Sequence, residues 1–427
     1  MIYLDHNATT PIDQRVLDAM TPFFTTNFGN PASRHHALGC NAAKVVETAR
    51  EQVAAVIRAD PREIIWTSGA TESDNLALQG VAQSSAYRKK HIITVVTEHR
   101  AVLDPCEVLE TRGFDVTYLG VDSDGCLNVD RIAEVITDQT LMVSVMHANN
   151  EIGVLHPIAT IGALCKERGV LFHTDATQSF GKELIDVNTM GIDLLSASAH
   201  KINGPKGVGV LYIRRRDPRV RCEALLYGGG HERGLRSGTL NVPGIVGMGV
   251  ASTLPANNQV RALRDQLEQG ICSRLDGVTI NGHQTKRLAN TTNLSFHGVD
   301  GETLMKRIPD IAVSSSSACT SAQLQPPPST SRLVIAGSRT KRPPWYRDQS
   351  RSTETTTPEH QPRISRLEAA GNGGRGGGLR VPRPPPTEDA AQRSVSLKAI
   401  AFAVGSTPTV AATIPASSDG TIRQSQY

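Results

Sequence analysis

Two charged residues of this chain stand in sequence contexts in which they could do chemistry. Lys201 lies in the segment SAHKINGPKG, between small residues and a tight turn. A lysine in such a confined apolar setting loses its proton more readily and can form a Schiff base, although most lysines are solvated surface residues. Asp175 follows the apolar run VLFH. It could ligate a metal, hold a hydrogen bond in the core, or face a cationic ring nitrogen, and Gln178, one helical turn on, could reach the same ligand.

A third segment, TSGATESDN around Thr71, has the pattern of a strand that ends, a glycine turn and a helix that begins. The free N–H groups of a helix N-terminus bind phosphate, and the Thr71 hydroxyl can add a donor. Taken alone, a plain capped helix start is the commoner explanation. Pyridoxal 5'-phosphate (PLP) chemistry, however, needs a Schiff-base lysine, an acid at the pyridine nitrogen and a phosphate cradle together. The conjunction of Lys201, Asp175 and Thr71 therefore predicts a PLP site.

The elements that must position these residues alternate between strand and helix patterns. Short β-rich runs occur at residues 63–67, 91–96, 141–146 and 170–173, and amphipathic helical stretches lie between them, including 41–57 and 158–168. This alternation predicts an α/β fold with a mostly parallel sheet covered on both faces. In such sheets the site lies beyond the carboxyl ends of the strands, which is where the three motifs fall.

The pattern changes twice towards the C-terminus. After residue 250, a helix at 260–275, a strand at 291–296 and a short helix at 302–307 predict a smaller α+β domain. After Leu324 the sequence is dominated by Pro, Gly, Ser, Thr and Arg, a composition that predicts disorder. We therefore divide the chain into an N-terminal segment that joins the small domain (1–15), a large domain (16–250), a partial small domain (251–324) and a low-complexity tail (325–427).

The overall composition excludes several classes of function. A net charge of +4, from 45 basic and 41 acidic residues, does not indicate nucleic acid or a membrane surface as a partner. The sequence contains neither a secretory signal pattern nor an apolar run long enough to span a bilayer. The seven cysteines are scattered, odd in number and without a C-x-x-C pair, which fits a reducing compartment and no resident metal. We expect a cytoplasmic protein.

Seven motifs in order resemble the signature set of the NifS/IscS-type cysteine desulfurases, in the class-V aminotransferase-like PLP family. They are TSGATESDN, TEHRAV, ANNEIG, DATQS, SAHKINGPKG, GGGHERGLRSGT and SSSSACTSA, and they cover almost all of the chain up to Leu324. The resemblance implies the fold-type-I PLP architecture with a seven-stranded-type sheet, and a homodimer. It also implies conversion of L-cysteine to L-alanine, with the sulfur left as a persulfide on an enzyme cysteine for iron–sulfur clusters and other thio-cofactors. The partner would be a sulfur-acceptor or iron–sulfur scaffold protein.

The resemblance also implies roles for individual residues. Lys201 matches the Schiff-base lysine, Asp175 the acid at the pyridine nitrogen, and Gln178 the group that faces the ring hydroxyl. His99 matches the histidine that stacks on the ring and transfers protons. Further matches are the phosphate cradle (Ala70, Thr71, Ser198 and His200), a phosphate contact lent by the other subunit (Thr239) and a contact to cofactor and substrate (Asn150).

Cys319, in SSSSACTSA, matches the cysteine that accepts the sulfur. Small polar residues surround it, which indicates a mobile, solvated loop suited to a persulfide carrier. The same thiolate could ligate a cluster transiently.

The sequence departs from the family after Leu324. Relatives continue with helices that complete the small domain and with an arginine that grips the substrate carboxylate; Arg363 is too weakly placed to be nominated for that role. A frameshift is the simplest account. Four hypotheses remain open: an active desulfurase, a PLP-binding but catalytically impaired homologue, another PLP enzyme such as a selenocysteine lyase or an aminotransferase, and a non-catalytic partner that works through its basic, Pro-rich tail. The SSSSACTSA loop argues against an aminotransferase, and the joint presence of Lys201, Asp175, His99 and Cys319 argues against a non-catalytic partner.

Overall fold

A seven-stranded sheet forms the centre of the structure, which is a computed structural model that describes residues 1–255, 259–299 and 301–314. The strand order is β2-β8-β7-β6-β5-β3-β4; β8 runs antiparallel to both of its neighbours, and the other pairings are parallel. The strands are β2 (Ile64–Thr67), β3 (His91–Val95), β4 (Asp115–Leu119), β5 (Thr140–Ser144), β6 (Leu171–Asp175), β7 (Leu194–Ser198) and β8 (Gly209–Ile213). The predicted α/β class with a mostly parallel sheet is therefore confirmed.

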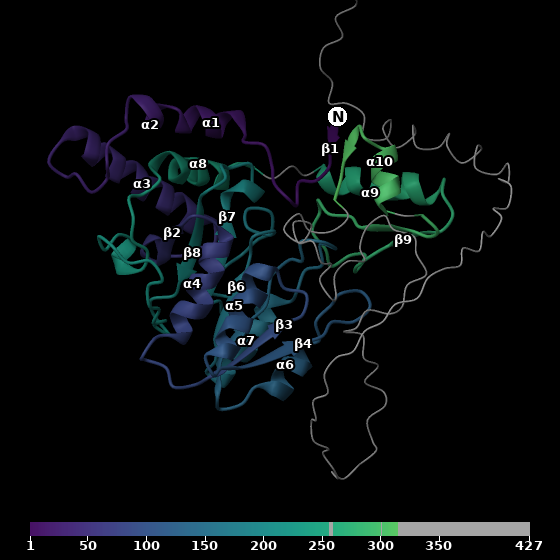
Figure 1. Ribbon diagram of the computed structural model, residues 1–427, viewed down its shortest axis with the longest axis horizontal. Helices are drawn as coiled ribbons and strands as arrows, with labels where there is room; N and C mark the ends of the chain where they lie inside the picture. The colour runs from purple at the N-terminus through teal and green to yellow at the C-terminus, as the bar shows by residue number, and fades with distance from the viewer. Residues whose placement is uncertain (256–258, 300, 315–427) are drawn as a thin grey trace, which may run out of the picture.

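Helices cover both faces of the sheet (Figure 1). They are α1 (Gln14–Met20), α2 (Pro22–Thr25), α3 (Ala37–Val56), α4 (Ala70–Ala82), α5 (Arg100–Thr111), α6 (Val129–Val135), α7 (Ile158–Arg168) and α8 (Val242–Ser252). Alternate residues of a strand enter different cores even at the edge of the sheet: in β2, Ile65 packs with α4 and α5, whereas its neighbours Ile64 and Trp66 pack with α3 and α8. Burial on both faces explains why the strands read as continuous apolar runs.

A smaller region lies beside one end of the sheet (Figure 1). It contains α9 (Val260–Cys272), the antiparallel pair β9 (Val278–Ile280) and β10 (Leu294–Phe296), and α10 (Gly301–Arg307). Strand β1 (Ile2–Tyr3) pairs in parallel with β11 (Ile311–Ala312), so the first residues of the chain lie in this region. The tail at 325–427 lies outside the described residues, and the boundaries at residues 15, 250 and 324 stay predictions.

The described residues contain no helix that is both long enough and apolar enough to cross a membrane. Within the same ranges, no group of three or more His, Cys, Asp or Glu side chains is arranged to hold a metal ion.

Candidate active site

A cavity of about 1150 Å³ lies where the strands end, between the sheet and the smaller region. Asp175 is the last residue of β6 and Ser198 the last of β7, and both line this cavity. Thr71, in the first turn of α4 after β2, and His99 and Asn150, in the loops after β3 and β5, also line it. The cavity lies beyond the carboxyl ends of the parallel strands, where this topology places ligand sites.

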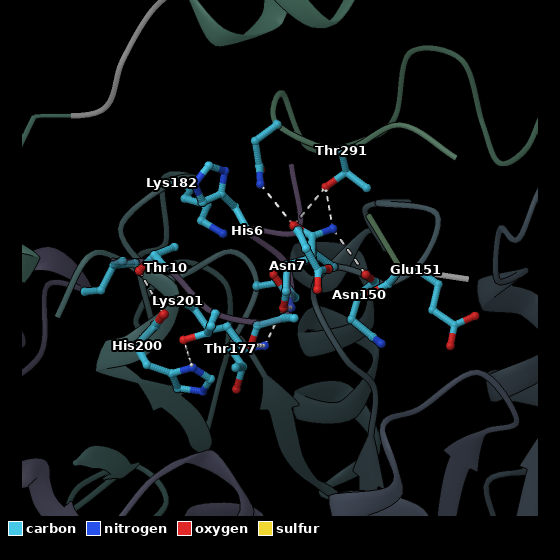
Figure 2. Close-up of a pocket in the computed structure, with 18 of the residues that line it drawn as sticks. His6, Asn7, Thr10, Asn150, Glu151, Thr177, Lys182, His200, Lys201 and Thr291 are labelled. Atoms are coloured by element: carbon cyan, nitrogen blue, oxygen red, sulfur yellow. Dashed lines mark hydrogen bonds between the residues drawn. The ribbon is translucent and has the colours of Figure 1, made fainter. Parts of the chain in front are cut away.

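Lys201 ends a single 3-10 turn (Ala199–Lys201) directly after β7. Its Nζ donates hydrogen bonds to the carbonyl oxygen of Ala8, at 2.9 Å, and to that of Asn7. The segment that precedes α1 is fixed to the same turn, because the Thr10 amide and hydroxyl both donate to the His200 carbonyl at 2.9 Å. The Lys201 amine is thus held in the wall of the cavity by carbonyl groups of the N-terminal segment (Figure 2).

Asp175, at the end of β6, and Gln178, in the turn that follows, line the same cavity as this amine. Asp175 is buried, and its Oδ1 accepts a hydrogen bond from the Thr177 amide at 2.8 Å. The Gln178 Nε2 atom donates to the Asn7 carbonyl at 2.9 Å, but its Oε1 atom is buried with no hydrogen-bond partner among the described residues. A buried polar atom without a partner marks a place that a ligand group can fill.

Two further carboxyl groups, Asp74 and Glu98, lie close to Asp175. Burial raises the pKa of Asp74 well above its ordinary value, and the neighbouring Asp175 raises it further. Burial likewise raises the pKa of Glu98, whose Oε1 accepts a hydrogen bond from the Met146 amide at 2.5 Å. Burial thus favours the protonated, neutral form of both groups, because the protein interior disfavours negative charge.

The N-terminus of α4 forms the third part of the site. Helix α4 begins after Gly69, whose φ is 155°, and no side chain caps its first turn. The first N–H groups of a helix have no partner within the helix, so these amides can bind an anion. Glycine is needed at position 69 because of this φ, and at position 209 because a Cβ there would lie 2.6 Å from the Gly69 Cα.

Histidines at the edge of the cavity are held in defined orientations. His99 is the N-cap of α5, and its Nδ1 accepts a hydrogen bond from the Ala101 amide at 3.1 Å. That bond fixes the ring and leaves Nε2 as the nitrogen that carries the proton in a neutral imidazole. Burial lowers the pKa of His200 to about 4, with contributions from Lys201 and Lys206, so His200 is neutral; its Nδ1 lies 3.1 Å from the Thr9 hydroxyl.

The cavity brings together most of the residues predicted from the sequence. Its lining includes Ala70, Thr71, His99, Asn150, Asp175, Gln178, Ser198, His200 and Lys201. Thr239 is exposed and does not line the cavity, and Cys319 lies outside the described residues.

Sequence reasoning missed two contributors, Asn7 and Lys182. Asn7 donates to the Asn150 carbonyl at 3.2 Å and to the Thr291 hydroxyl at 3.0 Å, and Lys182 lines the cavity beside His6. In the sequence, the adjacent polar residues His6 and Asn7 in the segment LDHNATTP were the available indication that Asn7 belongs to a site. Nothing in the sequence around Lys182 indicated a role in the site, apart from its position seven residues after Asp175.

The donor set fits PLP. A buried acid, a lysine amine, an unpartnered Gln178 oxygen and an uncapped helix N-terminus all open on one cavity. These groups match the pyridine nitrogen, aldehyde, ring hydroxyl and phosphate of the cofactor.

Comparisons with known proteins agree with this geometry. The family model of class-V aminotransferases matches residues 2–339, and so extends past Leu324. The cysteine desulfurase IscS of Anaeromyxobacter dehalogenans is 54 % identical over 331 residues, which are 76 % of this chain and 82 % of the relative. IscS of Rickettsia prowazekii is 53 % identical, over 76 % of this chain and 80 % of the relative.

Solved structures show the same likeness. A NifS-like protein superposes with a TM-score of 0.70 at 40 % identity, over 74 % of this chain and 87 % of that one. The structure described as SspA in complex with cysteine superposes with a TM-score of 0.67 at 38 % identity, over 75 % of this chain and 91 % of that one. The chain belongs to the class-V aminotransferase family of PLP-dependent enzymes, and within that family to the cysteine desulfurases. The relatives at over 50 % identity carry the name cysteine desulfurase IscS.

Proposed function

We propose that this chain is a PLP-dependent cysteine desulfurase that converts L-cysteine to L-alanine and transfers the sulfur to Cys319. The observation that carries the proposal is the opening of the Lys201 amine, the Asp175 carboxylate and the uncapped α4 N-terminus on one cavity. Relatives at over 50 % identity are named cysteine desulfurases, and one similar structure is described as a complex with cysteine.

The residues of the site have distinct tasks. The α4 N-terminus, Thr71, Ser198 and neutral His200 would hold the phosphate, and Asp175 would face the ring nitrogen. When bound, PLP supplies an aldehyde that links to amines and a ring that withdraws electrons from the substrate α-carbon. Lys201 can take up the α-proton at Nζ and return it, and His99 can hold a proton at Nε2.

The sulfur transfer balances without an external oxidant. The Cys319 thiolate attacks the sulfur of the substrate, an S–S bond forms, and the C–S bond of the substrate breaks with its electrons remaining on the β-carbon. A proton added at that carbon completes alanine, and the sulfur stays on the enzyme as a persulfide. One cysteine and one enzyme thiol thus give one alanine and one persulfide.

The remaining assignments extend the proposal. A sulfur-acceptor or iron–sulfur scaffold protein would take the sulfur from Cys319, and the protein would act in the cytoplasm. A homodimer would let the exposed Thr239 reach the phosphate of the second subunit. The Thr239 loop is joined to the site in its own chain through the ion pair between Arg236 and Glu72, with Nε and Oε1 2.9 Å apart.

The test combines product analysis with labelling. Purified holoenzyme given L-cysteine should release alanine and, with a reductant, sulfide in equal amounts. Borohydride reduction followed by peptide mapping should place the cofactor on Lys201. Cys319→Ser should keep the cofactor absorption and lose persulfide formation. Cofactor on another lysine, or alanine formation at the parent rate by Cys319→Ser, would refute these assignments, and release of selenide alone from selenocysteine would favour a selenocysteine lyase.

A further inference from the structure

Lys182 carries a buried amine that the mechanism above does not use. It follows the turn after β6, and its Nζ is buried with no hydrogen-bond partner among the described residues. The side chain lines the same cavity as Lys201, and Figure 2 shows it beside His6. An ammonium group without a partner is costly to bury, so its retention points to an anion that arrives with the ligand.

The charges around Lys182 do not neutralise it. Its pKa is lowered to about 8, mainly by burial and in part by the neighbouring Lys201, while Glu183 acts in the opposite direction. His6 faces it from the N-terminal segment, and Lys182 in turn lowers the pKa of His6. Across residues 1–255, 259–299 and 301–314, no carboxylate lies within ion-pair distance of Nζ, and Glu183 makes no such pair. Lys182 therefore remains mainly charged at pH 7.

Three other lysine and arginine side chains line the cavity, and each either has other hydrogen-bond partners, is exposed to solvent, or is the amine that reacts. Arg264 donates to the Asp265 Oδ1 atom at 2.6 Å and to the Leu288 carbonyl at 2.7 Å. Lys206 is exposed, and Lys201 is the amine that reacts. Two anionic groups enter the cavity during the proposed reaction, the cofactor phosphate and the substrate carboxylate, and the phosphate is accounted for by the α4 N-terminus.

We propose that Lys182 binds the α-carboxylate of the amino-acid substrate. The inference rests on the proposed function and assigns a carboxylate contact within it. A lysine ammonium offers a point charge, whereas an arginine offers two parallel N–H groups to a carboxylate. Lys182 therefore selects for a carboxylate but holds it less rigidly than a guanidinium does, so this chain binds cysteine more weakly than an enzyme with an arginine clamp.

The test compares two ligands that differ only in the carboxylate. L-Alanine and ethylamine are titrated into the holoenzyme, and binding is followed by the change in cofactor absorption. In Lys182→Met the dissociation constant for L-alanine should rise about ten- to a hundred-fold, the usual effect of losing a charge-assisted hydrogen bond. The constant for ethylamine should change less than about two-fold. Lys44→Met, on an exposed face of α3, is the matched control and should change neither constant.

Each other outcome has a defined meaning. Equal changes for both ligands, or no change for L-alanine, overturn the inference. Loss of cofactor absorption by a folded Lys182→Met also overturns it, because Lys182 would then hold the cofactor. If Lys182→Met does not fold, Lys182→Arg replaces it: a preference for L-alanine over ethylamine at least equal to that of the parent supports the inference, and a lost preference overturns it. Absence of alanine formation from cysteine by the parent refutes the proposed function instead, while the titration still reports on Lys182.

Discussion

The buried ion pair between Arg50 and Glu232 gives the sharpest stability prediction. Arg50, in α3, contacts Glu232 through Nη1–Oε2 at 2.7 Å and Nη2–Oε1 at 2.9 Å, and the two side chains are 3 % and 2 % exposed. The Trp66 amide also donates to Oε2 at 2.9 Å, and Arg50 Nη1 donates to the Ile64 carbonyl at 2.8 Å. The pair thus joins the 3-10 turn Glu232–Gly234 to α3 and to the edge strand β2.

Glu232→Gln keeps the shape of the side chain but leaves the Arg50 charge buried without its one buried carboxylate partner. Breaking a buried pair on one side costs about 3–5 kcal/mol. Glu47→Gln is the matched control, because Glu47 contacts the same arginine at 3.1 Å but is 61 % exposed. A contact whose carboxylate is in solvent contributes about 0–1 kcal/mol.

Urea-induced unfolding of both variants, followed by far-UV circular dichroism, measures the two costs under identical conditions. We expect a loss of about 3–5 kcal/mol for Glu232→Gln and of less than about 1 kcal/mol for Glu47→Gln. Equal and small losses would refute the reasoning, since they would mean that solvent reaches the Arg50 guanidinium.

Two further predictions concern the site and the pH dependence of stability. Asp175→Asn removes the charge that would face the ring nitrogen, so kcat should fall about a hundred- to a thousand-fold while cofactor absorption is retained; an unchanged kcat in steady-state assays would contradict this role. Burial lowers the pKa of His156 to about 4, and neither ring nitrogen has a partner among the described residues. The unfolded chain, with an ordinary pKa near 6.5, binds this proton more readily, so the stability contributed by the neutral ring is complete above about pH 6.5 and is lost as the pH falls towards 4. The free energy of unfolding of His156→Leu relative to the parent should therefore be higher by about 2 kcal/mol at pH 5 than at pH 7.5, measured by urea titration at both values; equal differences at the two values would show that His156 does not bury a neutral ring.

The sequence predicted those elements whose apolar pattern matches their burial. The helix at 158–168 has the observed bounds, because Ile158, Ile161 and Cys165 keep a helical spacing and Gly169, at φ 60°, ends it. Strands β7 and β8 were not predicted individually. Leu194–Ser198 contains small and polar residues, yet it is fully buried at the centre of the sheet, where α4 covers it. Its strand state depends on neighbours that are distant in sequence.

Residues 291–296 illustrate the opposite error. The prediction of a strand from residue 291 was wrong at its start, because β10 begins at Leu294. The Thr291 hydroxyl is used by Asn7, and the Asn293 amide group donates to the Glu151 carbonyl at 3.2 Å. These contacts hold the two residues in the wall of the cavity, and local β-propensity does not report them.

Within the site, sequence motifs identified the residues that stand at strand ends and helix starts, since the topology of a parallel sheet brings such positions together. Asn7 could not be placed from its own segment, because its partners Asn150 and Thr291 are more than a hundred residues away. The buried state of the Lys182 amine likewise depends on how the N-terminal segment covers the cavity, which no local pattern encodes.

The pairing of β1 with β11 has a consequence for the biosynthesis of the chain. Tyr3 leaves the ribosome about 310 residues before its partner Ala312. At about 5–20 residues per second, the first strand therefore waits about 15–60 s for its partner. The sheet from β2 to β8 is complete well before then, so β1 joins the smaller region only as a late step, after the main scaffold is able to form.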